Sequence, residues 1–120
     1  MQLERLEDLE SKRENRFSKL IGSFKTMTMN PKRVHLLIGG RVQGVYFRQG
    51  LKETAEKNNV LGWVQNLSNN KVESVLEGND SNVDAVIEWA HFGPAGAFVE
   101  ELKITEENYI GNFSEFLIRY

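Results

Sequence analysis

The stretch RVHLLIGGRVQGVYFRQGLKETA, residues 33–55, contains the change of periodicity that decides the fold. Apolar side chains first alternate from Val34 to Ile38 and stop at a pair of glycines, which predicts a strand over residues 33–38. From Phe47 onward they recur every four positions, which is the spacing of one face of a helix. A strand, a glycine-rich turn and a helix are therefore expected in direct succession.

The rest of the chain repeats this alternation of strand and helix patterns. An apolar stripe from Val83 to Ala90 predicts a second helix, which begins near the capping residues 79–81 and ends at Gly93-Pro94. Alternating or β-branched runs predict four more strands, of which the first two form a hairpin, at residues 60–65, 72–76, 98–104 and 113–119.

These elements predict an α+β protein. Their order, β-α-β-β-α-β with one further strand, is that of the ferredoxin-like fold, an α/β sandwich in which one antiparallel sheet has two helices on one face. The apolar stripes that face each other are expected to form the core, at Val34, Leu36, Ile38, Leu51, Ala55, Val64, Val72, Leu76, Val86, Ile87 and Ala90. Because this fold serves RNA binders, ligand sensors and enzymes, the function has to be inferred from a site.

The composition excludes several classes of protein. With 120 residues, 40% of them hydrophobic, the chain is long enough for one compact domain. A formal net charge of −2 disfavours binding of bulk nucleic acid. The chain has no cysteine, and only His35 and His91 remain as soft ligands, so we expect no metal site and no cofactor. No run approaches the roughly 20 apolar residues of a membrane span, and residues 1–30 are too charged for a signal peptide, so we expect a cytoplasmic protein with no membrane partner.

Residues 1–30 are expected to form an arm and linker that precede a domain at residues 31–120. The arm is rich in Leu, Glu, Lys and Arg, which favours a helix. Charged residues interrupt its apolar stripe, so a frayed helix or a disordered segment is favoured over a sustained coiled coil. Met27 and Met29 leave open a start of translation just before the first strand. A monomer is expected unless the arm self-associates.

The most unusual segment is the loop between the first strand and the first helix, GGRVQGVYFR at residues 39–48. Glycines at such a turn let backbone N–H groups surround an anion, and the positive end of the helix dipole adds to the attraction. Arg48 can add two parallel donors to phosphate oxygens. The loop lacks the Gly-Lys-Ser/Thr of a nucleotide-hydrolysing P-loop. A phosphate site is therefore one interpretation, and a tight turn followed by an exposed arginine is the other.

Two motifs resemble the signatures of the acylphosphatase family. GRVQGVYFR, residues 40–48, is similar to Gly-x-Val-Gln-Gly-Val-x-Phe-Arg, the phosphate loop of that family. GWVQN, residues 62–66, resembles its second signature, Gly-Trp-Val-x-Asn. The resemblance extends over residues 33–120 and departs from the family at the hairpin turn, where Ser68-Asn69-Asn70 replaces the frequent Pro-Asp-Gly.

This resemblance implies a metal-independent hydrolysis of small acyl phosphates to a carboxylate and inorganic phosphate. It implies that Arg48 binds the phosphoryl group and that Asn66 positions the attacking water. It also implies a backbone cradle for the phosphate, formed by the loop residues Val42, Gln43, Gly44, Val45 and Tyr46. The expected ligands are an acyl phosphate substrate and inorganic phosphate or another anion.

Two other functions remain open from the residues. A regulatory, anion-binding module of the same fold needs the loop and Arg48 but has no use for a water-positioning Asn66. RNA binding on the open sheet face needs a basic surround, which the acidic excess of residues 31–120 disfavours. For Tyr46, packing is favoured over a place at the mouth of the substrate site, and both tryptophans are expected to pack.

Overall fold

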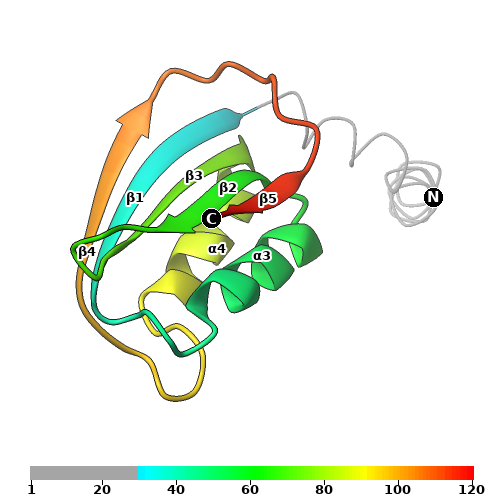
Figure 1. The fold of residues 1–120 in the computed structure, drawn as a ribbon. Coiled ribbons are helices and arrows are strands. Elements are labelled where there is room, and N and C mark those ends of the chain that lie inside the picture. Colours follow the sequence, from blue (N-terminus) through cyan, green and yellow to red (C-terminus); the bar gives the residue numbers. More distant parts are fainter. Residues whose placement is uncertain (1–29) are drawn as a thin grey trace, which may run out of the picture. The chain divides into compact units, whose positions relative to one another are not determined.

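The computed structural model describes residues 30–120. The expected arm and linker comprise residues 1–30, and residues 1–29 of this segment lie outside the described part. Strands and helices follow one another in the predicted order (Figure 1), as β1 Pro31–Arg41, α3 Phe47–Lys57, β2 Leu61–Asn66, β3 Val72–Asn79, α4 Asp80–Ala90, β4 Phe98–Glu107 and β5 Phe116–Arg119. Neither helix of residues 30–120 is long and apolar enough to cross a membrane.

The strands form one five-stranded sheet in the order β4-β1-β3-β2-β5. Both helices cover the same face of this sheet, as Figure 1 shows, and the other face is open. β1, β3, β2 and β4 pair in antiparallel fashion, with β1 between β3 and β4. The ferredoxin-like α+β prediction is confirmed.

The last strand corrects the expectation of a purely antiparallel sheet. β5 pairs parallel to β2, with Gly62 opposite Phe116. The reason is the connection at residues 108–115, which contains neither strand nor helix and brings the chain from β4 at one edge to the opposite edge. This connection also shortens β5 relative to the predicted residues 113–119. The sheet is therefore mixed, and its fifth strand lies beside the strand that ends at Asn66.

The first strand runs past the glycine pair that was expected to end it. The pairing of β1 with β4 shifts between Gly39 and Gly40, which marks an irregularity of the bulge type. Gly40 has a φ of 124°, and a Cβ there would lie 2.2 Å from the carbonyl oxygen of Phe98. Only glycine fits this close approach of two backbones, so β1 continues to Arg41 and delivers the loop beyond the end of the sheet.

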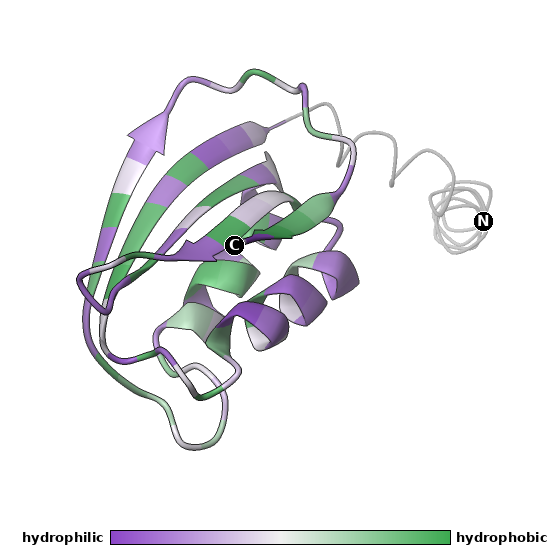
Figure 2. Cartoon of the chain, in the orientation of Figure 1, coloured by the Kyte–Doolittle hydropathy of each residue, from purple (hydrophilic) through white to green (hydrophobic). Residues whose placement is uncertain are grey.

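The core lies between the sheet and the two helices. Ten of the eleven side chains predicted for the core are buried, and Ile87 is half-buried against them. Figure 2 shows α3 mostly in hydrophilic colour and the visible part of α4 mostly in hydrophobic colour. The predicted core omitted six buried hydrophobic residues, namely Val42, Phe47, Val60, Val75, Val83 and Phe116. Phe47 packs against Trp89 with ring centroids 5.3 Å apart, so the start of α3 is fixed against α4.

Candidate active site

The loop between β1 and α3 exposes the beginning of a helix. Gly44 and Tyr46 have positive φ angles of 74° and 62°, and these left-handed residues turn the chain directly into α3. The carbonyl of Tyr46 accepts the first helical hydrogen bond from the N–H of Gly50 at 3.0 Å. No acidic residue lies in the first turn of α3, so nothing there neutralises the positive end of the helix dipole. The loop and helix start therefore favour an anion.

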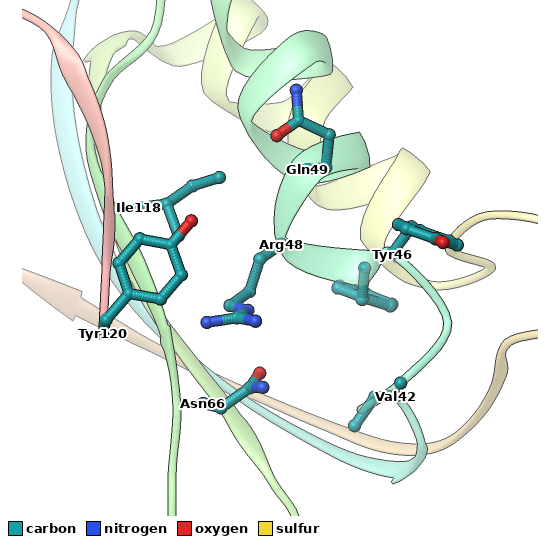
Figure 3. A pocket seen from close by; sticks show the side chains of 9 residues that line it. Val42, Tyr46, Arg48, Gln49, Asn66, Ile118 and Tyr120 are labelled. Atoms are coloured by element: carbon teal, nitrogen blue, oxygen red, sulfur yellow. The ribbon is translucent and has the colours of Figure 1, made fainter.

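A cavity of about 490 Å³ opens at this loop. Its wall combines the loop, the start of α3, the end of β2 and the end of the chain (Figure 3). The residues that line it are Val42, Gly44, Tyr46, Phe47, Arg48, Gln49, Asn66, Ile118 and Tyr120. The two signature motifs, separate in the sequence, thus contribute to one cavity.

Arg48 is the cation of the cavity. Its side chain extends from the first turn of α3 toward Asn66, as Figure 3 shows. The guanidinium carbon lies 5.0 Å from the centre of the Tyr120 ring, an arrangement that orients the planar group without neutralising it. Among residues 30–120, no carboxylate forms an ion pair with Arg48. Its donors are available for an anion that enters the cavity.

Asn66 supplies an unsatisfied acceptor. It is the last residue of β2, and the alternation of the strand points its side chain to the inner face, as for Val64, while Gln65 points outward. The Oδ1 atom of Asn66 is buried and accepts no hydrogen bond within residues 30–120. A buried acceptor without a partner costs about 1–3 kcal/mol. Such an oxygen can accept a hydrogen bond from a water or a ligand that enters the cavity.

The comparisons with known proteins agree with this geometry. A family model described as acylphosphatase matches residues 34–118. Curated acylphosphatases are 52% identical over 91 residues in Pyrobaculum arsenaticum and 47% identical over 89 residues in Syntrophus aciditrophicus. This chain belongs to the acylphosphatase family. The matched region covers 75% of this chain and 96% of the Pyrobaculum protein, and 74% and 93% for the Syntrophus protein.

A solved acylphosphatase structure supports the same assignment. The acylphosphatase from Coxiella burnetii superposes with a TM-score of 0.72 at 34% sequence identity. The alignment covers 78% of this chain and 100% of the Coxiella chain. The region shared with the family is therefore the described domain.

Of the seven residues expected for the acylphosphatase site, five line the cavity and two do not. Val42, Gly44, Tyr46, Arg48 and Asn66 line the cavity, whereas the other two loop residues do not. The side chain of Gln43 turns away to the hairpin between β2 and β3, and Val45 packs against the core.

Tyr46 does not have the packing role that the sequence favoured. Its side chain is 83% exposed and borders the opening of the cavity. The left-handed conformation of Tyr46 explains this result, because the residue precedes α3 and its side chain projects from the turn rather than onto the helix face. Trp63 is not part of the core either. It lies on the open face of the sheet, where the guanidinium carbon of Arg119 is 4.3 Å from the centre of its ring.

Three lining residues lie outside the predicted site, namely Gln49, Ile118 and Tyr120, and Phe47 was predicted only as part of the phosphate loop at residues 40–47. Ile118 and Tyr120 reach the cavity only because β5 pairs with β2. The alternation of Phe116, Ile118 and Tyr120 was visible in the sequence, but the partner strand that brings them to the cavity was not.

The open face of the sheet holds a separate polar group. His35 Nε2 lies 2.7 Å from Glu73 Oε2, and Gln65 donates to Glu73 Oε1 at 2.7 Å. The hydrogen bond from His35 holds the pKa of the Glu73 carboxyl below its ordinary value, with Gln65 adding to the effect against the cost of burial. Within residues 30–120, no group of three or more His, Cys, Asp or Glu side chains is placed to hold a metal ion.

Proposed function

We propose that this domain hydrolyses small acyl phosphates to a carboxylate and inorganic phosphate, without a metal ion. The observation that carries the proposal is the pairing, in one cavity, of the free cation Arg48 with the unsatisfied oxygen of Asn66. An anion site alone needs only the first of these groups. A hydrolase also needs a group that orients water, and Asn66 has that chemistry.

The phosphoryl group binds to the loop and to Arg48. Backbone N–H groups around Gly44 and the start of α3 meet the phosphate oxygens, while the guanidinium donates to them from the other side. This arrangement lowers the negative charge that would repel a nucleophile. It also fixes the phosphorus atom against the cavity wall, which supplies much of the rate enhancement by positioning.

Asn66 orients the water. Its Oδ1 accepts one hydrogen bond from the water, which directs a lone pair of the water oxygen toward phosphorus. The new P–O bond forms as the bond from phosphorus to the acyl oxygen breaks, and the carboxylate leaves with the bonding electrons. A phosphate oxygen of the substrate takes up the water proton. Atoms and charge then balance without a protein side chain as base.

The chemistry of the substrate accounts for a reaction without metal. A carboxylate is a good leaving group, so the P–O bond that breaks needs little further activation. Arg48 and the backbone dipoles of the loop offset the negative charge of the transferred phosphoryl group. We also propose that the domain acts as a monomer, since one copy supplies both Arg48 and Asn66, and that it acts in the cytoplasm.

The test is hydrolysis of benzoyl phosphate, followed by ultraviolet absorbance in the presence of EDTA. Arg48→Ala is expected to abolish both phosphate inhibition and turnover, because it removes the charge that holds the phosphoryl group. Asn66→Ala is expected to keep phosphate inhibition while kcat falls by about two to four orders of magnitude.

The control variants change the same residue types elsewhere. Arg119→Ala removes an arginine from the open face, and Asn108→Ala removes an exposed asparagine of the β4–β5 connection. Both should retain wild-type kcat. A folded wild-type protein that binds phosphate without hydrolysing acyl phosphates would overturn the enzyme and leave the regulatory anion-binding module.

A further inference from the structure

Gln43 is the one residue of the loop whose side chain makes fixed polar contacts outside it. Its Nε2 donates to the carbonyl oxygen of Leu67 at 2.7 Å and to that of Lys71 at 2.9 Å. Both hydrogens of the amide are therefore used, and both acceptors are backbone atoms of the hairpin between β2 and β3. This side chain takes no direct part in the proposed hydrolysis.

The two acceptors are the ends of the hairpin turn that follows Asn66. Leu67 is the next residue after Asn66, and its own N–H donates to the carbonyl of Lys71 at 2.8 Å. The amide of Gln43 thus caps the closing pair of the turn. A change at this pair is transmitted to Asn66 through a single peptide unit.

On its other side, Gln43 is part of the phosphate loop. Its sequence neighbours Val42 and Gly44 both line the cavity. The side chain therefore connects the backbone that would hold the phosphate to the strand end that would hold the water. Among residues 30–120, no other side chain of the loop 42–46 donates a hydrogen bond to the hairpin.

We propose that Gln43 is a positioning residue, which sets the distance between the phosphate loop and Asn66 and thereby the line of attack of the water on phosphorus. The inference rests on the proposed function, since it assigns a role within the same reaction. The side chain of Gln43 does not line the cavity. It acts through the carbonyls of Leu67 and Lys71.

The chemistry of the contact demands an amide of this length. Two carbonyl oxygens need two donors, and a glutamine amide supplies both while remaining neutral. A methionine has similar length and volume but no donor, and an ionised glutamate would place negative charge against two carbonyl oxygens. Gln43→Met therefore removes the link and changes the packing least.

The experiment compares Gln43→Met with Gln65→Met. Gln65 is the matched control, because it is a glutamine at the same strand end whose amide donates to Glu73 on the open face. For Gln43→Met, kcat with benzoyl phosphate should fall about 10- to 100-fold, as expected for a displacement of about 1 Å between reacting groups. The inhibition constant for inorganic phosphate should change less than about threefold, because Arg48 and the helix start remain.

Gln65→Met should leave kcat and phosphate inhibition within about twofold of the wild type. The inference is overturned if kcat of Gln43→Met is unchanged, if kcat and phosphate affinity fall by the same factor, or if Gln65→Met loses as much kcat. The first outcome means that the link is not needed, the second that Gln43 serves binding, and the third that the loss reflects general loosening of the strand end.

A second readout does not depend on turnover. In nuclear magnetic resonance titrations with inorganic phosphate, the wild type should shift both the backbone amide of Gly44 and the side-chain amide of Asn66. In Gln43→Met, the Gly44 shift should persist and the Asn66 shift should fall by at least half. If the wild type does not hydrolyse acyl phosphates, the proposed function fails, and an Asn66 shift retained in Gln43→Met would separately overturn the link.

Discussion

Glu77 is the charged side chain on which the position of the last strand depends, and Glu77→Gln should destabilise the domain more than its small change in shape suggests. Only 3% of its side chain is exposed, and Arg33 Nη1 lies 3.1 Å from its Oε2. The same carboxylate accepts the backbone N–H of Ile110 at 2.9 Å and that of Gly111 at 3.1 Å. It therefore fastens the connection between β4 and β5 to β3.

The magnitude follows from what glutamine cannot do. Its single oxygen can replace only one of the two carboxylate oxygens, and its NH₂ group would then face one of the backbone donors, Ile110 or Gly111. One buried N–H without a partner costs about 1–3 kcal/mol, and the remaining bonds lose the charge that makes each worth about 1.5–3 kcal/mol. Since Arg33 keeps a second carboxylate partner, the expected loss is about 3 kcal/mol, at the lower end for a broken buried pair.

The assay is urea unfolding at pH 7, with the melting temperature as a second measure. A loss of about 3 kcal/mol corresponds to a fall of about 12–24 °C for a domain of this size. The matched control is Glu107→Gln, which removes the other partner of Arg33, 2.9 Å from its Nε and 38% exposed. An exposed pair contributes less than about 1 kcal/mol. Equal losses of unfolding free energy for the two variants would refute the reasoning, since the burial of Glu77 and its two backbone donors would then contribute no additional stability.

Two further predictions concern backbone space and pH. Gly40→Ala should lower the free energy of unfolding in urea by about 3 kcal/mol or more, because the new Cβ would lie 2.2 Å from the Phe98 carbonyl oxygen. In the control Gly44→Ala the new Cβ meets no atom within 4 Å, so only the positive φ should lower it, by about 1–2 kcal/mol. Similar losses for both variants would contradict a role for the contact with Phe98. The lowered pKa of Glu73 stabilises the fold above the ordinary value of about 4.3, and this stabilisation is lost as the pH falls through the lowered value. The free energy of unfolding of His35→Leu should therefore depend less on pH between about pH 5 and pH 3 than that of the wild type. The same pH dependence in both proteins would show that the contact between His35 and Glu73 does not cause this loss of stability.

Much of the fold was predictable because the signals were local. The change from period two to period four around residues 39–47 fixes a strand, a turn and a helix, and no distant contact is needed to detect it. Arg48 also had a local signal, the glycine-rich turn before a helix, whereas Asn66 became a candidate only because GWVQN, residues 62–66, resembles a family signature. Their common place at one cavity follows once β2 pairs with β3 in the interior of the sheet.

The rest depended on contacts between residues far apart in the sequence. The pairing of β5 with β2 requires the 108–115 connection to be anchored, and its anchor, Glu77, lies more than 30 residues earlier. In the sequence, Glu77 looks like one more charged residue of an alternating strand. The role of Gln43 was missed for the same reason. Its hydrogen-bond partners are backbone carbonyls, which every residue type has, so the sequence of the hairpin does not indicate this contact.

Asn66 connects the stability of the domain to its chemistry. A folded protein normally pairs its buried polar atoms, and an apolar residue at this strand end would avoid the cost of an unsatisfied oxygen. The oxygen persists where the cation of Arg48, the open helix start and the end of β5 all meet. If both lone pairs of its oxygen were engaged, Asn66 would have no acceptor left for a water, so the property that weakens the fold at this position is the one that the proposed reaction requires.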